Sequence, residues 1–145
     1  MTLRLMARPS EELPMDMRFP RGSYGYIADK NKATADKLLK ELDWDVAVFF
    51  MQQAIEKYLK QYLVNNEMGT EKLLATHSLL TLCEAACIDK LRRFYNDLDV
   101  IENAYSNGSY PSAVFVEFTA EEAVRLYDSF RQVCRIMNEC LLSTQ

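Results

Sequence analysis

The stretch that decides the fold is residues 46–64, which read VAVFFMQQAIEKYLKQYLV. Apolar residues recur there every three or four positions, which is the spacing of an amphipathic α-helix. The main apolar arc consists of Ala47, Met51, Ala54, Ile55, Tyr58, Leu59 and Tyr62. The first two turns are also apolar on the other side, through Val46, Phe49 and Phe50. A helix that is apolar all round is central in a bundle or lies between a core and a partner. We therefore expect a central helix here, with Val46, Phe49 and Phe50 at a dimer interface.

Four further blocks carry the same helical spacing: about residues 27–42, 71–87 and 90–105, and a last block that opens with Thr119-Ala-Glu-Glu122. The last of these begins with a capping box, the pattern that marks the start of a helix. Apart from residues 114–116, nothing alternates with the period of a β-strand. The sequence thus predicts an all-α fold, an up-and-down bundle of four to five helices. Its predicted core is Ala47, Met51, Ile55, Leu59, Leu98, Ile101, Tyr127, Phe130 and Cys134.

Proline and glycine concentrate at the N-terminal end of the chain. Pro9, Pro14, Pro20, Gly22 and Gly25 all fall within the first 26 residues. Because these residues interrupt helices, we expect residues 1–26 to form an irregular N-terminal arm and residues 27–145 a single helical domain. Residues 18–26 mix basic and aromatic side chains, a composition that can hold single-stranded nucleic acid. The alternative is an arm that packs over its own domain or over a neighbouring subunit.

Length, charge and hydropathy limit the classes of protein to which the chain can belong. The chain has 145 residues and a formal net charge of −4, so a broad electrostatic contact with nucleic acid is not expected. No run of 18 apolar residues exists, and the first residues do not resemble a signal peptide. We expect one globular domain that is located in the cytoplasm and does not enter a membrane.

The residues that carry most enzyme chemistry are scarce. His77 is the single histidine, no Cys-x-x-Cys pair exists, and no glycine-rich phosphate loop is present. The sequence therefore predicts neither a metal site nor a cofactor. The four cysteines (Cys83, Cys87, Cys134 and Cys140) lie within helical blocks, so we expect small core side chains rather than disulfides.

Three segments resemble a known family. Residues 45–60 (DVAVFFMQQAIEKYLK) resemble the second helix of HEPN domains, whose signature there is QQAxEKxLK. Thr76-His77-Ser78-Leu79 resembles the start of the next helix in that family, THxL. Tyr105-Ser-Asn-Gly-Ser-Tyr-Pro111 resembles the family's segment Y-x-x-x-R-Y-P. The order and spacing of these segments agree over residues 28–142.

The resemblance implies a helical bundle that forms a homodimer, often beside a minimal nucleotidyltransferase made as a separate chain. It also implies that some relatives are ribonuclease toxins with an arginine four to six residues before a histidine, and that the nucleotidyltransferase can silence such a toxin by adenylylating a tyrosine. This chain departs from the ribonuclease pattern. Ser109 stands where the arginine is expected, and no arginine precedes His77 at the required distance. The sequence thus favours a protein without catalytic residues.

One face of the central helix is the main candidate site. Gln53, Lys57 and Gln61 follow each other at intervals of four residues, opposite the main apolar arc. We expect them to line a groove for a nucleotide, an RNA or a partner protein, together with His77, Tyr105, Ser109 and Tyr110. The alternative is a solvated stripe in which Glu56 and Lys60 form an ordinary surface pair. His77 would then be a helix-start residue whose imidazole bonds to the backbone.

Two other functions stay open at this point. The first is a ribonuclease toxin with a degenerate site, in which Arg92 or Arg93 replaces the missing groups. The second is a helical adaptor with a purely structural role.

Overall fold

The computed structural model describes residues 18–106 and 116–143. The elements are α2 (Tyr24–Lys40), α3 (Trp44–Asn65), α4 (Glu71–Ala75), α5 (Leu79–Ala86), the 3₁₀ segment η3 (Asp89–Phe94), α6 (Tyr95–Ser106) and α7 (Ala120–Ser143). Within these residues every regular element is helical, so the predicted all-α class is confirmed. The described residues form six α-helices rather than four or five, because the block predicted at 71–87 divides into two. The 3₁₀ segment η3 precedes α6.

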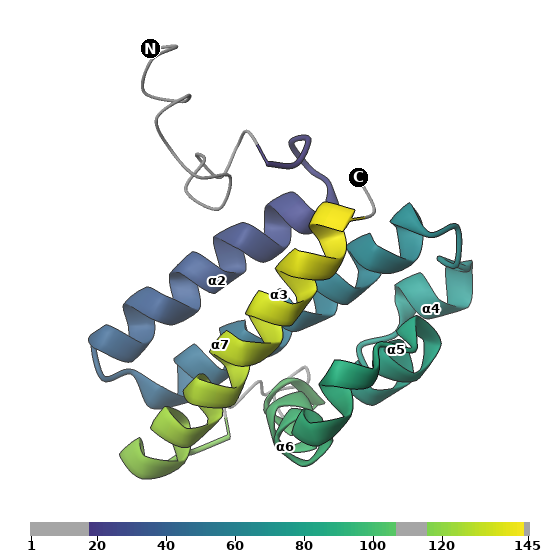
Figure 1. The fold of residues 1–145 in the computed structure, drawn as a ribbon. Helices are drawn as coiled ribbons and strands as arrows, with labels where there is room; N and C mark the ends of the chain where they lie inside the picture. The colour runs from purple at the N-terminus through teal and green to yellow at the C-terminus, as the bar shows by residue number, and fades with distance from the viewer. Residues whose placement is uncertain (1–17, 107–115, 144–145) are drawn as a thin grey trace, which may run out of the picture.

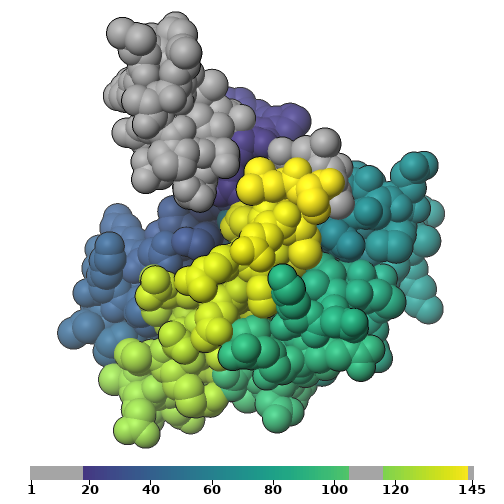
Figure 2. All heavy atoms as spheres, viewed as in Figure 1, coloured from purple at the N-terminus to yellow at the C-terminus, as the bar shows by residue number. Residues whose placement is uncertain are grey.

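The arrangement of the helices places α3 at the centre of the bundle. α2 runs antiparallel to α3, α7 lies across both, and α4 to α6 pack beside the other flank of α3 (Figure 1). In the space-filling view α7 crosses the face of the molecule, with α2 on one side and η3 and α6 on the other (Figure 2). The predicted central position of α3 is therefore confirmed, and the helix touches α2, α5, α6 and α7.

The first helix begins earlier than the sequence predicted. α2 starts at Tyr24 because Ser23 is its N-cap, with the Ser23 hydroxyl oxygen accepting from the amide of Tyr26. The expectation that residues up to 26 cannot be helical is thus wrong for the last three of them. α2 ends at Lys40, and Leu42 follows in the left-handed region (φ 64°). The amide of Asp43 then donates to the carbonyl of Leu38.

The block predicted as one helix over residues 71–87 is broken at Thr76-His77-Ser78. Each of the two resulting helices has its own N-cap: Thr70 accepts from the amide of Leu73, and Ser78 accepts from the amide of Thr81. A carboxylate from α6 adds to the second cap, since Glu102 Oε1 lies 3.2 Å from Ser78 Oγ and 3.3 Å from the amide of Leu80. The break holds His77 on an extended segment beside α3.

The last helix starts as predicted. Glu122 Oε1 accepts from the amide of Thr119 at 2.9 Å, and the Thr119 hydroxyl accepts from the amide of Glu122 at 3.1 Å. These two bonds are the reciprocal pair of a capping box. Just before it, Asp45 of α3 accepts from the amide of Phe118, which attaches the start of α7 to the start of α3.

The core follows the predicted apolar positions. Eight of the nine predicted core residues are buried, and the ninth, Tyr127, is half-buried with its hydroxyl donating to Asp36 of α2. All four cysteines are free thiols. Cys83 and Cys134 are buried as expected, whereas Cys87 is exposed, because it ends α5 in a left-handed conformation that turns it out of the core.

Residues 18–23, which we call the strap, pack onto the bundle rather than leaving it. Phe19 is buried against Gly25, where a Cβ atom would come within 2.6 Å of the phenyl ring. The Arg18 guanidinium pairs with Asp29 of α2 at 3.1 Å and also donates to Asn138 of α7. The strap therefore joins the beginning of α2 to the last part of α7 (Figure 1). Of the two readings of the arm, this part of it packs over its own domain.

Candidate functional site

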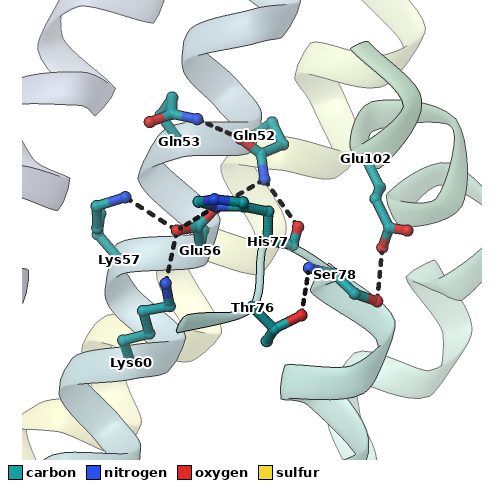
Figure 3. A network of polar contacts seen from close by, with 9 residues as sticks. All are labelled: Gln52, Gln53, Glu56, Lys57, Lys60, Thr76, His77, Ser78 and Glu102. Atoms are coloured by element: carbon teal, nitrogen blue, oxygen red, sulfur yellow. Dashed lines mark hydrogen bonds and ion pairs between the residues drawn. The ribbon is translucent and has the colours of Figure 1, made fainter. Parts of the chain in front are cut away.

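The buried carboxylate of Glu56 lies at the centre of a polar cluster on α3. We call this group the Glu56 cluster; it comprises Gln52, Gln53, Glu56, Lys57, Lys60 and His77. Five of these residues lie within three turns of α3, and His77 comes from the extended segment between α4 and α5 (Figure 3). Two segments about twenty residues apart in the sequence thus meet at one carboxylate.

Both oxygens of Glu56 accept more than one polar contact. Oε1 accepts from Gln52 Nε2 at 3.0 Å and contacts His77 Nδ1 at 3.1 Å. Oε2 receives the ammonium groups of Lys60 at 2.8 Å and Lys57 at 3.0 Å. Since an ionised carboxylate only accepts, His77 carries a proton on Nδ1 in this arrangement.

These contacts decide the charge of Glu56. Burial alone would raise the pKa of the carboxyl, but hydrogen bonds from Lys60 and Gln52, with the charge and hydrogen bond of Lys57, lower it to about 2. Glu56 is therefore ionised at neutral pH. Two ammonium groups next to one carboxylate leave the cluster with an excess of positive charge.

The side chains of the Glu56 cluster differ in exposure, from buried in the core to half-exposed at the surface. Glu56 and Lys60 are almost wholly buried, the side chain of Lys57 is 18% exposed and that of His77 is 49% exposed. The alternative, in which Glu56 and Lys60 form a solvated surface pair, is therefore wrong. The reason is that α3 is covered on this side by the segment 76–78, whose His77 carbonyl accepts from Gln52 at 3.2 Å.

The predicted groove residues do not all meet. Lys57 and His77 belong to the Glu56 cluster, and Gln53 joins it by donating to Gln52 at 2.6 Å. Gln61 serves another contact, since its Oε1 accepts from the amide of Gly25 at the start of α2 and its Nε2 donates to Asn65. Ser109, Tyr110 and the side chain of Tyr105 lie outside the described residues.

The alternative reading of His77, as a helix-start residue whose imidazole bonds to the backbone, did not predict its contact with a buried carboxylate. The imidazole contacts the Glu56 carboxylate, and it is Thr76 whose hydroxyl accepts from a backbone amide, that of Ser78. Sequence reasoning missed Gln52, Glu56 and Lys60 as site residues. Their signal was present, because they repeat every four residues beside the predicted stripe and belong to the QQAxEKxLK signature.

The predicted dimer residues lie on the same face of α3 as Lys57. Val46, Phe49 and Phe50 are half-buried, and the rings of Phe49 and Phe50 meet edge to face with centroids 5.3 Å apart. With 3.6 residues per turn, Val46, Phe50, Gln53, Lys57 and Val64 share one side of the helix. We call this side the outer face of α3; its apolar end and its polar middle are continuous.

Membrane-spanning helices and metal-binding groups are both absent from the residues that the structure describes. No helix within them combines the length and the apolar character that crossing a membrane requires. No three His, Cys, Asp or Glu side chains gather there in a way that could hold a metal ion.

The fold and the cluster define the chain as a helical-bundle domain whose central helix carries a buried, positively charged polar group. Among protein-family models, the one described as HEPN domain matches residues 25–140. The chain therefore belongs to the HEPN domain family, which confirms the resemblance seen in the sequence. Members of this family include ribonuclease toxins and binding adaptors, and HEPN domains often dimerise. Neither the curated proteins nor the solved structures contain a match.

Proposed function

We propose that this HEPN protein is a non-catalytic binding protein of the cytoplasm. In this proposal it forms a homodimer and holds the phosphate group of a nucleotide or of RNA at the Glu56 cluster. The observation that carries the proposal is the Glu56 cluster itself, in which two ammonium groups share one carboxylate. A nucleotidyltransferase chain is the protein partner that the family membership suggests.

The chemistry of Lys60 supports an anionic ligand. An ammonium group has three donors, and among the described residues Lys60 Nζ has one acceptor, Glu56 Oε2. Buried donors without acceptors cost free energy, so a further oxygen atom is favoured there. Lys57 donates to the same carboxylate oxygen from the surface side. It is therefore placed to donate to the same ligand oxygen as Lys60. A phosphate group would supply both lysines with acceptors.

The outer face of α3 supports the dimer. Its apolar end (Val46 and Phe50, with Phe49 beside them) continues into the polar middle at Gln53 and Lys57. A two-fold axis would place the same face of a second copy against it, as every symmetric dimer requires. Such a dimer would bring two Glu56 clusters close to one groove.

The non-catalytic part of the proposal rests on the histidine. Cleavage of RNA without a metal needs a proton-transfer group near the 2′-hydroxyl and a cation on the phosphate. His77 is the single histidine of the chain, its Nδ1 contacts a buried carboxylate, and no arginine stands four to six residues before it. The two roles that ribonuclease relatives give to an arginine and a histidine therefore have no matching pair here.

Calorimetric titration with adenosine 5′-monophosphate and with a short single-stranded RNA tests the ligand. We expect the wild-type chain to bind at least one of them and Lys57→Gln to bind at least tenfold more weakly. Lys37→Gln removes an exposed lysine of α2 and should bind as the wild type does. Absence of binding by the wild type to either probe would overturn the ligand proposal, and cleavage of the RNA would replace it with the ribonuclease alternative.

The dimer and the partner have separate tests. Sedimentation should give about twice the 16.8 kDa of one chain, and Phe50→Asp should give a monomer. Val124→Asp is the matched control, since Val124 is an exposed apolar residue of α7 and not of α3. Purification of the tagged chain from its native cells, followed by the mass of the intact complex, would show whether a nucleotidyltransferase accompanies it.

A further inference from the structure

The outer face of α3 has a symmetric order of residue types about Lys57. Gln53 and Gln61 stand four residues to either side of it, and Phe50 and Val64 stand seven residues to either side. Four residues are about one turn of an α-helix and seven are about two turns, so these side chains follow one side of α3. Gln53 and Lys57 accordingly lie on adjacent turns (Figure 3). The order along this side is apolar, amide, ammonium, amide, apolar in both directions.

Both ends of this face present apolar surface. Val64 is 42% exposed and Phe50 is half-buried, whereas Leu59 and Leu63 of the same helix are wholly buried. Removal of apolar surface from water is favourable, so both ends are suited to contact with a second helix. Between them the side chain of Lys57 is 18% exposed. The outer face thus has a charged centre between two apolar ends.

A second copy of α3 that runs antiparallel to the first fits this order. With a two-fold axis at Lys57, each residue before it lies beside the residue equally far after it in the other copy. The large Phe50 then meets the small Val64 of the second copy at both ends of the contact. A parallel pair would place two phenylalanines at one end and two valines at the other, so the helices would be unequally spaced. Antiparallel helices also bring opposite ends of their macrodipoles together.

We propose that α3 pairs antiparallel with α3 of a second copy about a two-fold axis at Lys57, and that one phosphate group on this axis accepts from both Lys57 ammonium groups. The inference rests on the proposed function and specifies the contact of its dimer and the number of its ligands. Each Lys57 shares the carboxylate of Glu56 with Lys60, so two facing Lys57 side chains repel each other. A phosphate group has oxygen atoms for both ammonium groups and removes this repulsion. Neither copy alone then holds the complete site.

Disulfide formation between introduced cysteines tests the antiparallel contact in the full chain. All variants carry Cys87→Ser, because Cys87 is an exposed thiol. A mixture of Phe50→Cys and Val64→Cys chains should form a covalent dimer with one chain of each kind, and neither variant should form one alone. In the antiparallel pair the two copies of Phe50 lie about 21 Å apart along the helices, whereas a disulfide needs Cα atoms within about 7 Å. Lys57→Cys lies on the axis and should cross-link with its own copy.

Three outcomes of this experiment contradict the inference. Covalent dimers of Phe50→Cys alone would indicate a parallel pair and would overturn the antiparallel contact. A wild-type dimer in sedimentation, with no cross-link in the mixture or in Lys57→Cys, would show that another face of the chain pairs. A wild-type monomer would overturn the homodimer of the proposed function and this inference with it. Failure of the contact and failure of the dimer are therefore distinguishable.

Sedimentation equilibrium at constant ionic strength tests the shared phosphate group. Without phosphate, Lys57→Gln should dimerise about threefold more tightly than the wild type, because one pair of like charges is removed. Inorganic phosphate should tighten the wild-type dimer and leave Lys57→Gln unchanged. Lys37→Gln, at an exposed position of α2, is the matched control and should respond to phosphate as the wild type does. A wild-type dimer that does not respond to phosphate would overturn the shared ligand, as would calorimetry that gives one adenosine 5′-monophosphate per chain rather than one per two chains.

Discussion

Two carboxylates of the bundle, Glu56 and Asp29, are equally hidden from water and yet have opposite properties. Glu56 is 0% and Asp29 is 3% exposed. Glu56 receives donors on both oxygens and its pKa is lowered to about 2, whereas Asp29 receives donors on one oxygen and its pKa is raised. The comparison teaches that burial by itself does not set the charge of an acid in this fold. The number and kind of donors that reach each oxygen atom decide it.

The largest expected effect on stability is at Glu56, the carboxylate that receives donors on both oxygens. Glu56→Ala should lower the free energy of unfolding by about 3–5 kcal/mol, because it leaves the ammonium of Lys60 buried without its partner. Urea unfolding followed by circular dichroism measures this change. Glu121→Ala, at an exposed position of α7, should change stability by less than about 0.5 kcal/mol. A loss of only about 1 kcal/mol in Glu56→Ala would show that the cluster is already open to water.

The pH dependence of the unfolding free energy should also report on Glu56. The folded pKa of Glu56, about 2, lies below its ordinary value of 4.5. Its contribution is therefore fully present above the ordinary value and is lost as the pH falls toward 2, with a size of about 3 kcal/mol. Unfolding free energies measured between pH 7 and pH 2.5 should fall accordingly in the wild type. Glu56→Gln cannot titrate at this position, so its curve should lack this component.

The strap should respond to a change that involves no charge. Gly25→Ala places a methyl group where the Phe19 ring lies, and we expect a loss of about 1–3 kcal/mol from the overpacking. Gly22→Ala meets no neighbour within 4 Å but has a φ of 82°, so about 1 kcal/mol of backbone strain is expected there. Thermal unfolding of the two variants distinguishes them. An unchanged stability of Gly25→Ala would indicate that Phe19 moves aside at no cost.

The smallest effect is expected at Asp29, and its sign is opposite to that of Glu56. Because the folded pKa of Asp29 is raised, the folded state binds its proton more tightly than the unfolded chain does. Asp29 therefore contributes stability at low pH, and this contribution is lost as the pH rises through the folded pKa. Asp29→Asn lacks this dependence and should differ from the wild type by about 1 kcal/mol or less at pH 7. If acidification destabilises the wild type relative to Asp29→Asn, the predicted contrast between Asp29 and Glu56 is wrong.

Much of the fold could be predicted from the sequence because apolar spacing is a local property. The central position of α3, the core residues on α6 and α7, and the capping box at Thr119 were all visible in the spacing of residues. The break at Thr76-His77-Ser78 was not, because no glycine or proline marks it. It depends on a hydroxyl cap at Ser78 and on the carboxylate of Glu102 from a distant helix.

The candidate site was predicted in part, for a related reason. The motif containing Gln53 and Lys57 was recognised together with His77, but Glu56 and Lys60 have the spacing of an ordinary surface pair. Their burial depends on the segment 76–78 covering α3, and a sequence pattern within one helix does not contain that information. Likewise, the fit of Phe19 against Gly25 depends on a chain reversal at Gly22 that composition does not specify.

The exposed end of α5 has a practical consequence for spectroscopy. Cys87 is the exposed thiol among the four cysteines, while burial raises the pKa of Cys83 to about 12 and also raises that of Cys134 and Cys140. Thiolates are the reactive form, so maleimide reagents at neutral pH should modify Cys87 first. The wild-type chain thus offers one attachment point for a fluorophore or a spin label without any mutation. In a symmetric dimer, two such labels would measure a single distance between the copies.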